Sequence, residues 1–571
     1  MAEDGARNVS ALSVNNLLSN DVVKQPLSMS VFSAQGFNRQ NTQKVQGTFT
    51  FSGRPELAKS QLSEHSAVYQ FERRTRPAAF TERRKTLPTM TVAFVQFSNK
   101  IIPTNRQLQR TEHPHWDFII GTGNIWQEAN DNDFSRIAMP FSLVEKNQNC
   151  VHNGVLSFLI NGEGKTSNFY YQISSETCLY YKVDLWGKGH VDYQSKQILN
   201  ADDVIKHYRQ EVSSRLPQLP IDDLTAQNAT IQLAKIAMIE AINPTDMSNF
   251  GVIYNGKHYT SSCKTRYGEY PFCSQLVLPS YSTAKSIFAG ISMLYLAKGF
   301  PTIFNEKVSD WIEECQGDNW QGVTFSHLLN MTTGNYHTTG HSSDEVAEHS
   351  QQFFKASIHQ EKIHYSCQQF PRKSTPGSTF VYHTSDTYLL GAALNAFLRS
   401  QLFASEDTQK IDLFDIVFKQ QLWPALKLSS IAYSTRKTSG NMQQPFTGYG
   451  LFFTQGDIAK ISKFLMNEQT ADSKFLDQTR LTDSLQRNQS NQDIHSQYPF
   501  IHYSNGFWKR NVTTLLLCEK ETWLPYMLGY GGINIVLAKH NLQYYYFSDS
   551  NHYLWHNAIK ELNKLTPLCR Q

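Results

Sequence analysis

Short runs in which apolar and polar residues alternate recur through the first third of the chain. They are rich in β-branched and aromatic residues, are separated by clusters of Gly, Asn, Ser and Pro, and cover residues 45–53, 66–74, 89–97, 115–123, 153–161, 167–174 and 178–186. Alternation with period two is typical of strands, and strands at this spacing favour a sandwich or a barrel. We therefore predict a β-rich, sandwich-like domain over residues 41–205, preceded by an N-terminal extension over residues 1–40.

The pattern changes after residue 198. Residues 200–216 have helical spacing with Asn200 as the N-cap, and residues 216–220 are predicted to be a linker. The later apolar spacing predicts strands over 249–262 and 534–547 and helices near 284–298, 383–400, 456–467 and 554–565. Strands at both ends with helices between them are typical of an α+β domain whose terminal strands share one sheet, and we place it at residues 206–571.

Composition and charge narrow the class of protein. The 571 residues are 40% hydrophobic and 12% aromatic, which is typical of a globular chain. The net charge of +4 does not indicate binding to nucleic acid or to an anionic membrane, and the most basic stretch, 73–85, is interpreted as solvated surface. The absence of an apolar run of 18 residues predicts no membrane span.

The cellular compartment is left open by two opposing signals. The first 30 residues lack the apolar stretch of a signal peptide, which favours the cytoplasm by default. The eight cysteines are an even number, and Cys263 and Cys273 are close enough to staple a hairpin if the protein is extracytoplasmic. No pair has zinc-ribbon spacing, so we predict no metal site, and His113 and His115 are interpreted as loop residues.

Small polar residues at 280–286 open the helix predicted near 284–298. Ser282 lies in its first turn, and Lys285, three residues later, shares its face. A serine hydroxyl needs an adjacent base to act as a nucleophile, and an amine buried beside a helix N-terminus loses proton affinity and can be that base. The same N-terminus offers the amide of Ser282 to an oxyanion. Taken alone, however, the pattern is more typical of a capping serine and a lysine that reaches for solvent.

A second segment, residues 374–394, changes this interpretation. A strand-like run ends in Tyr382, and a helix is predicted to start at His383 and Thr384. A tyrosine held just before a helix can pass protons between a nucleophile and a leaving group. The alternative is a tyrosine that only packs in the core.

The two segments, about 100 residues apart, together resemble motifs of the serine β-lactamase and penicillin-binding-protein superfamily, in particular its class C and esterase branch. Its SxxK motif matches Ser282 to Lys285, and its Tyr-x-Asn/Ser motif matches Tyr382 to Thr384. The resemblance implies that an antiparallel sheet flanked by helices and an all-helical subdomain form this part of the chain. The segments 323–335 and 449–466 also resemble family segments, so that the likeness covers roughly residues 220–571.

The chemistry implied by this resemblance is that of a serine hydrolase that forms an acyl-enzyme. Ser282 attacks a carbonyl, Lys285 removes its proton, and Tyr382 assists transfer of that proton to the leaving group. No metal or organic cofactor is needed. The expected partner is a small-molecule ester or amide. The second choice is a D-amino-acid peptide, which a peptidase or transpeptidase would use, and the third is a β-lactam. A catalytically silent binding protein with the same fold is a further alternative.

The chain departs from the family in the third motif, which is KTG, HTG or HxG. Its nearest equivalent contains Tyr530, Gly531 and Gly532 and has no cation, so the grip on the carboxylate of a penicillin or a D-alanyl-D-alanine terminus is in doubt. These three residues and Thr384, which replaces Asn or Ser in the second motif, are the candidate substrate-binding residues. An amide near Tyr530 is expected to complete the oxyanion hole.

The sequence leaves two questions open. The β-rich part is compatible with carbohydrate binding, with a lid over the cleft and with an oligomer contact, and the oligomeric state itself is unknown. His337 and His341 lie in a segment that rims the cleft in this family, so contact with substrate is conceivable there.

Overall fold

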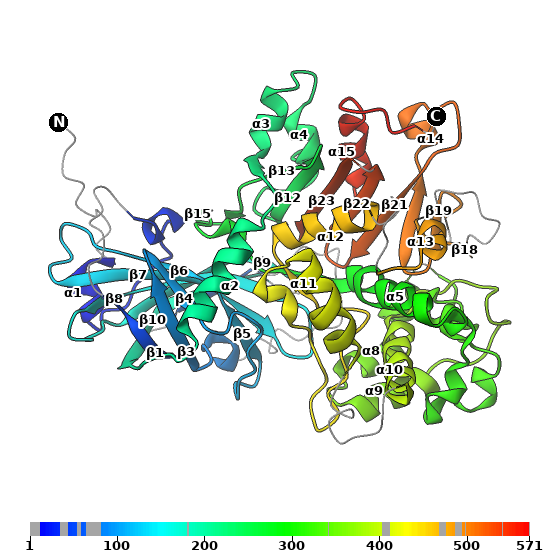
Figure 1. Ribbon diagram of the computed structural model, residues 1–571, viewed down its shortest axis with the longest axis horizontal. Coiled ribbons are helices and arrows are strands. Elements are labelled where there is room, and N and C mark those ends of the chain that lie inside the picture. Colours follow the sequence, from blue (N-terminus) through cyan, green and yellow to red (C-terminus); the bar gives the residue numbers. More distant parts are fainter. Residues whose placement is uncertain are drawn as a thin grey trace.

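The structure is a computed structural model, and it describes residues 12–34, 44–53, 59–63, 82–179, 182–340, 342–401, 412–467, 475–485, 494–496, 498–539 and 541–569. A β-rich N-terminal lobe and a larger α+β lobe lie side by side (Figure 1). The predicted strand at 66–74 lies outside the described residues. Elsewhere the two lobes have the predicted classes of structure, which confirms the α+β fold with a β-rich N-terminal region.

The strands of the β-rich lobe form one antiparallel sheet that closes into a barrel, because β1 pairs with both β3 and β10. Closure removes the exposed sheet edges that promote aggregation. Two shorter strands, β2 and β5, pair with β10 and β7. The strands are β1 (Gln46–Gly53), β2 (Lys59–Ser63), β3 (Met90–Phe97), β4 (Lys100–Pro103), β5 (Trp116–Ile120), β6 (Gly123–Trp126), β7 (Phe134–Glu145), β8 (Val151–Asn161), β9 (Phe169–Thr177) and β10 (Lys182–Ser195).

Aromatic side chains fill the interior of the barrel. Phe49 stacks on Phe94 with ring centroids 3.9 Å apart, and Phe158 meets Phe49 edge-on at 4.9 Å. Helix α2 (Ala201–Ser213) begins after Asn200, as predicted, and packs against the outside of the barrel through Val204. Two short N-terminal helices, α1 (Val14–Leu18) and η2 (Met29–Phe32), contact β8.

The α+β lobe contains a second sheet, in the order β11-β13-β12-β23-β22-β21-β20-β19-β18. The predicted sharing of one sheet by the terminal strands is confirmed, since β12 pairs with β23. The predicted linker at 216–220 is wrong in part, because residues 218–220 form an edge strand, β11, parallel to β13. The strands are β11 (Gln218–Pro220), β12 (Met247–Tyr254), β13 (Lys257–Thr260), β18 (Ile494–His495), β19 (Ile501–Ser504), β20 (Phe507–Asn511), β21 (Trp523–Gly529), β22 (Ile533–Lys539) and β23 (Leu542–Ser548).

Helices cover both faces of this sheet. Because neighbouring side chains of a strand point to opposite faces, Tyr545 of β23 packs in the same core as α12 (Gln455–Asn467), whereas Tyr544 packs in the core that contains α15 (Trp555–Leu562). Helices α3 (Ile221–Ala226) and α4 (Leu233–Ile236) complete the second layer.

An all-helical subdomain lies beside the sheet, as the resemblance implies (Figure 1). Before α5 (Ile291–Gly299), residues Lys285–Gly290 form a π-helical turn in place of the predicted start of an α-helix, and such turns are frequent at functional sites. The helices of the subdomain are α6 (Phe325–Leu329), α7 (Ser343–Val346), α8 (Glu348–Lys355), α9 (His359–Gln368), α10 (Thr384–Ser400) and α11 (Trp423–Leu426).

All eight cysteines form disulfides. Cys263–Cys273 closes the small hairpin of β14 (Lys264–Thr265) and β15 (Gly268–Glu269), as the sequence predicts for an oxidising compartment. The other pairs are Cys150–Cys178, Cys315–Cys367 and Cys518–Cys569. Within the described residues, no helix has the length and apolar composition needed to cross a bilayer.

Buried polar contacts join the two lobes. Arg436 of the α+β lobe forms an ion pair with Asp117 of β5 and donates to the backbone carbonyls of Val144, at 2.8 Å, and Gln148, at 3.1 Å. Both Arg436 and Asp117 are buried, and Lys146 adds a second cation 3.7 Å from the carboxylate of Asp117.

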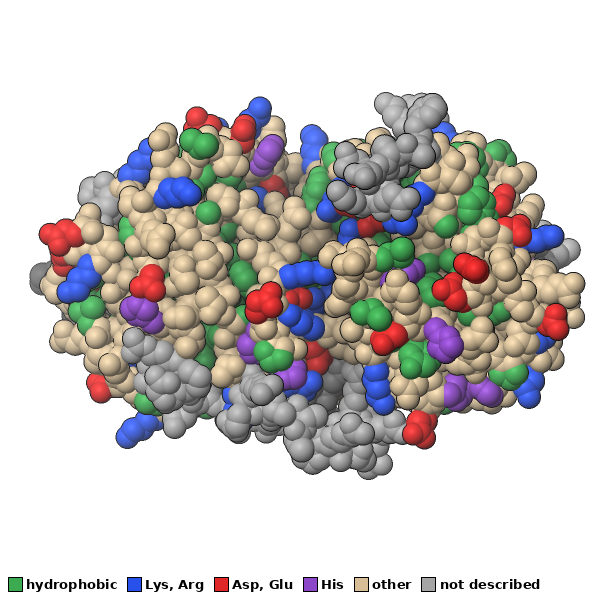
Figure 2. All heavy atoms as spheres, turned by 90° about the horizontal axis from the view of Figure 1, so that it is seen from below, with side chains coloured by type: hydrophobic (Ala, Val, Ile, Leu, Met, Phe, Trp, Pro, Cys, Tyr) green, Lys and Arg blue, Asp and Glu red, His purple; other side chains and the backbone are tan. Residues whose placement is uncertain are grey.

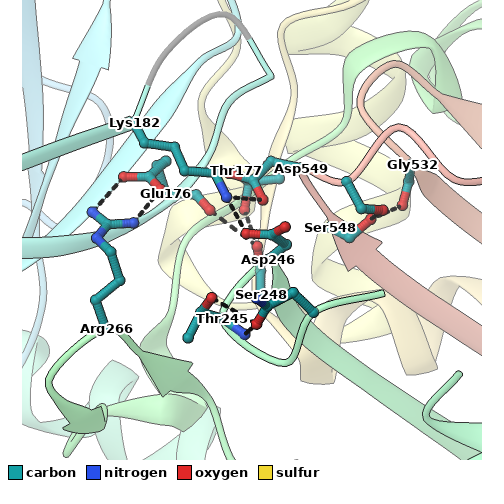
Figure 3. A network of polar contacts seen from close by, with 12 residues as sticks. Glu176, Thr177, Lys182, Thr245, Asp246, Ser248, Arg266, Gly532, Ser548 and Asp549 are labelled. Atoms are coloured by element: carbon teal, nitrogen blue, oxygen red, sulfur yellow. Dashed lines mark hydrogen bonds and ion pairs between the residues drawn. The ribbon is translucent and has the colours of Figure 1, made fainter. Parts of the chain in front are cut away.

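A second polar network lies where the start of β10 meets the α+β lobe (Figure 3). Lys182 pairs with Asp246 and lies 3.7 Å from the buried carboxylate of Asp549. Next to Asp549, the hydroxyl of Ser548 donates to the carbonyl of Gly532 at 2.9 Å. The network also contains the ion pair of Arg266 with Glu176 and the hydrogen bond between Thr177 and Ser248.

Charges on the surface are mixed. Figure 2 shows acidic and basic side chains interspersed over one face, without a broad patch of either sign. This agrees with the small net charge of +4 and gives no sign of a nucleic-acid surface on that face.

Candidate active site

Ser282 lies in a tight turn, Tyr281–Thr283, immediately before the π-helical turn. Tyr281 has a positive φ of 41°, which a non-glycine residue adopts only when its surroundings hold it there. The barrel supplies part of this support. Asn149, between β7 and β8, accepts hydrogen bonds from the backbone N–H of Tyr281 at 2.6 Å and from the hydroxyl of Ser280 at 3.2 Å.

Lys285 is buried directly behind Ser282. Its Nζ lies 3.1 Å from Ser282 Oγ, 2.8 Å from Thr384 Oγ1 and 3.4 Å from the carbonyl of Gly448. Burial lowers the pKa of Lys285 to about 8, although the nearby carboxylates Glu345 and Asp386 act in the opposite direction. A substantial fraction of the amine is therefore neutral at mildly alkaline pH and able to accept a proton.

Tyr382 ends the segment before α10, as predicted. Its ring centroid is 4.8 Å from Lys285 Nζ, and its ring stacks on Trp508 at 6.1 Å. Burial raises the pKa of Tyr382 well above its usual value, and a hydrogen bond with Ser282 only partly offsets this effect. The phenol thus stays protonated at neutral pH and is available as a proton donor.

Thr384 links Lys285 to a carboxylate that the sequence analysis did not identify. While its hydroxyl accepts from Lys285, the same hydroxyl donates to Glu345, and its backbone N–H donates to the second oxygen of Glu345 at 2.9 Å. Glu345 therefore caps the start of α10, and the hydroxyl of Thr384 connects it to the amine of Lys285. A threonine at this position of the second motif can make this link because its hydroxyl both donates and accepts.

Another carboxylate, Asp386, is buried and lies in the first turn of α10. Burial raises its pKa to about 7, and the imidazole of His383 opposes this shift. His383 in turn stacks on Phe370 at 4.0 Å and lies 3.3 Å from Asp344. The charge state around Lys285 consequently changes over the same pH range as the lysine itself.

The third-motif residues divide into two groups. Tyr530 lines the cleft and places its ring 5.9 Å from that of Tyr281. Gly531 and Gly532 do not line the cleft. They have φ of 92° and 100° and pack against other segments of the same chain. A Cβ on Gly532 would lie 2.5 Å from the hydroxyl of Ser548, so these glycines permit the turn behind Tyr530.

Ser282, the predicted nucleophile, lines a cleft of about 520 Å³. Gln148 and Asn149 of the barrel form part of its wall, so the β-rich lobe borders the site directly. Among the described lining residues, Glu345 and Arg510 are the ones that carry a charge. Half of the remaining lining residues are aromatic: Tyr281, Phe354, Tyr382, Tyr449, Tyr498, Trp508, Tyr526, Tyr530, Tyr553 and Trp555.

The histidines noted in the sequence lie elsewhere. His337 is outside the cleft lining and makes a hydrogen bond with the carbonyl of Gln369, and His341 lies outside the described residues. The rings of His113 and His115 are 6.1 Å apart in a loop of the barrel. Within the described residues, Cys150, His152 and Cys178 have metal-ligand spacing, but their two sulfurs form a disulfide.

The sequence did not identify most residues of the cleft lining, among them Asn149, Glu345 and Arg510. Asn149 belongs to the other lobe, and Arg510 lies within strand β20, which has no recognisable motif. Glu345 had a weak signal, because it lies a few residues after the histidine segment that rims the cleft in this family.

Comparison with known proteins places these features in a family. No curated protein matches the chain. A D-stereospecific amidohydrolase from a Streptomyces species is 13% identical, with a TM-score of 0.41, over 58% of this chain and 98% of its own. A class C β-lactamase is 14% identical, with a TM-score of 0.40, over 66% of this chain and 100% of its own. The model of the family described as Beta-lactamase matches residues 252–543, more than half of the chain, and the chain therefore belongs to the Beta-lactamase family.

Proposed function

We propose that the protein is a serine hydrolase that acts through an acyl-enzyme on a small ester or amide. Ser282 Oγ attacks the carbonyl carbon while Lys285 takes its proton, and the tetrahedral adduct collapses as the bond to the leaving group breaks. The leaving group departs with a proton, and water then cleaves the new ester bond and restores Ser282. The products are a carboxylic acid and an alcohol or amine.

The observation that carries this proposal is the Lys285–Ser282 pair. An amine 3.1 Å from a half-buried serine hydroxyl, with a pKa lowered to about 8, combines the geometry and the proton affinity that a general base needs. The alternative from sequence, a lysine that reaches for solvent, does not fit a buried ammonium position.

We assign Tyr382 to the leaving-group side of the reaction. Because burial keeps its phenol protonated, it is suited to donate a proton rather than to remove one from Ser282. Lys285, which has received the serine proton, can then reprotonate the phenol. The backbone N–H groups of Ser282 and of Tyr530 are our candidates for the oxyanion hole.

The composition of the cleft wall supports a small ester or amide as the substrate. Half of its uncharged residues are aromatic, and no lysine or histidine stands in the third motif to grip a penicillin carboxylate close to Ser282. A D-amino-acid peptidase or transpeptidase and a β-lactamase are the alternatives within the same chemistry. A silent binding protein is the alternative outside it.

We further propose that the protein works in an oxidising, extracytoplasmic compartment, because four disulfides are rare in a chain kept reduced. Intact mass after treatment with a thiol-alkylating reagent tests this for protein isolated from its native source. No added mass before reduction is expected, and alkylation of all eight cysteines without reduction would contradict the proposal.

The catalytic proposal is tested with a fluorophosphonate probe and intact mass. Wild-type protein is expected to gain one adduct, whereas Ser282→Ala gains none and Lys285→Ala reacts far more slowly, because both groups act as one unit. No adduct at any pH from 6 to 9 would favour the silent binding protein. Hydrolysis of p-nitrophenyl esters, amino-acid anilides and nitrocefin then ranks the substrate classes.

A further inference from the structure

Arg510 on β20 carries a positive charge at one end of the cleft. Its guanidinium donates to Nδ1 of His556 at 3.2 Å and lies 5.3 Å from the ring centroid of Phe500. Burial, helped by Arg510 itself, lowers the pKa of His556 to about 4, so that this imidazole is neutral at pH 7. Within the described part of the chain, no carboxylate lies within ion-pair distance of Arg510. These contacts orient the guanidinium, and none of them supplies a negative charge.

An aromatic wall connects Arg510 to the nucleophile. Trp508, two positions earlier on the same strand, shares the face of Arg510 and stacks on both Tyr382, at 6.1 Å, and Tyr526, at 6.4 Å. Two strand positions span roughly 7 Å, so the backbone of Arg510 lies about that far along β20 from that of Trp508, whose ring stacks on Tyr382, the neighbour of Ser282. This distance leaves room for an apolar or aromatic group of the substrate.

Glu345, the other charged residue of the cleft, already accepts hydrogen bonds within the protein. Both oxygens of Glu345 are bound by Thr384, next to Lys285, whereas Arg510 lines the cleft and has no ion pair with any described residue. The guanidinium of Arg510 is half-buried, so part of its surface is open to the solvent and can be offered to an anionic group of a ligand. Arginine also binds carboxylates through two parallel hydrogen bonds.

We propose that Arg510 binds a carboxylate at the end of the substrate remote from the scissile carbonyl, with an apolar or aromatic group between the two. This inference deepens the proposed function and rests on Ser282 being the reacting residue. The third motif contains no cation, and Arg510 supplies anion recognition from a neighbouring strand, farther from the nucleophile. The substrate is then an elongated molecule with a scissile ester or amide at one end, a carboxylate at the other and an apolar or aromatic group between them.

Binding to a variant without the nucleophile tests the subsite. In Ser282→Ala, quenching of tryptophan fluorescence reports ligand binding, since Trp508 and Trp555 line the cleft. Biphenyl-4-carboxylate is expected to bind roughly 10- to 100-fold more tightly than biphenyl-4-carboxamide, as a charge-assisted hydrogen bond predicts. Adding Arg510→Gln should abolish this preference, and adding Arg510→Lys should reduce it, because lysine keeps the charge without the paired donors.

Arg480 offers a matched control, because its guanidinium also lies over an aromatic ring, that of Phe304, but outside the cleft. Arg480→Gln should preserve the preference for the carboxylate. Equal binding of the two ligands by Ser282→Ala, or a preference that survives both Arg510 substitutions, would overturn the proposal. Since the assay needs no catalysis, it fails independently of the fluorophosphonate test, which addresses the reacting serine alone.

Discussion

At the scale of single residues, Lys285 determines how the proposed activity depends on pH. The base must be neutral to accept the proton of Ser282, and its pKa is lowered from 10.5 to about 8. Its neutral fraction is therefore roughly one tenth at pH 7 and nine tenths at pH 9. We expect kcat/KM to rise about tenfold between these pH values and then to level off, as measured with an ester substrate from pH 6 to 10. A flat profile over this range would contradict the assignment of Lys285 as the base.

Glu345 should shift that profile in a predictable direction. Its negative charge favours the ammonium form and raises the pKa of Lys285. Glu345→Gln keeps a side chain that can accept from Thr384 but removes the charge, so the midpoint of the pH profile should move to lower pH, by about half a unit to one unit. Glu348→Gln, an exposed neighbour on α8, is the control and should leave the midpoint in place. A shift to higher pH would show that Glu345 acts by another route.

The sequence predicted the residues whose roles follow from local spacing. Ser282 and Lys285 are one helical turn apart, and Tyr382 immediately precedes a helix, so both segments could be identified without a structure. Glu345 and Arg510 reach the cleft only through the packing of segments far apart in the chain. No periodicity in the sequence records such an encounter.

At the scale of elements, the turn that carries Ser282 depends on the loop between β7 and β8. Asn149 of this loop holds the strained Tyr281 backbone through a hydrogen bond of 2.6 Å. Asn149→Ala removes that bond, and we expect kcat to fall roughly tenfold while KM changes little, because small displacements of a nucleophile weaken transition-state geometry. Steady-state kinetics measure this split.

A barrel asparagine far from the turn provides the control for that experiment. Asn124 on β6 contacts Lys100 at 2.6 Å, and Asn124→Ala should leave kcat unchanged. If Asn149→Ala raised KM alone, the side chain would act in substrate binding and not in positioning Ser282.

Elements with a clear hydrophobic period were predicted, and those without one were not. Helices α10, α12 and α15 follow the expected ranges closely, and the expected strand ranges 249–262 and 534–547 correspond to the pairs β12–β13 and β22–β23. Strand β7 was missed because it is buried along its whole length and so has no polar alternation. Strand β11 was taken for a linker because its three residues include a proline, and only pairing with β13 makes it a strand.

At the scale of the whole molecule, the barrel and the α+β lobe should unfold as one unit. Arg436 bridges them with a buried ion pair to Asp117 and hydrogen bonds to the carbonyls of Val144 and Gln148. Arg436→Met would remove the nearer cation from the buried Asp117 carboxylate and leave only Lys146, 3.7 Å away, a change that costs up to about 3–5 kcal/mol. We expect a single calorimetric transition for the wild type and a lower Tm for the variant, with the activity at Ser282 lost in the same transition. Two separate transitions in the wild type, with activity following only the second, would mean that the barrel is an independent appendage and that the support from Asn149 is not needed for catalysis.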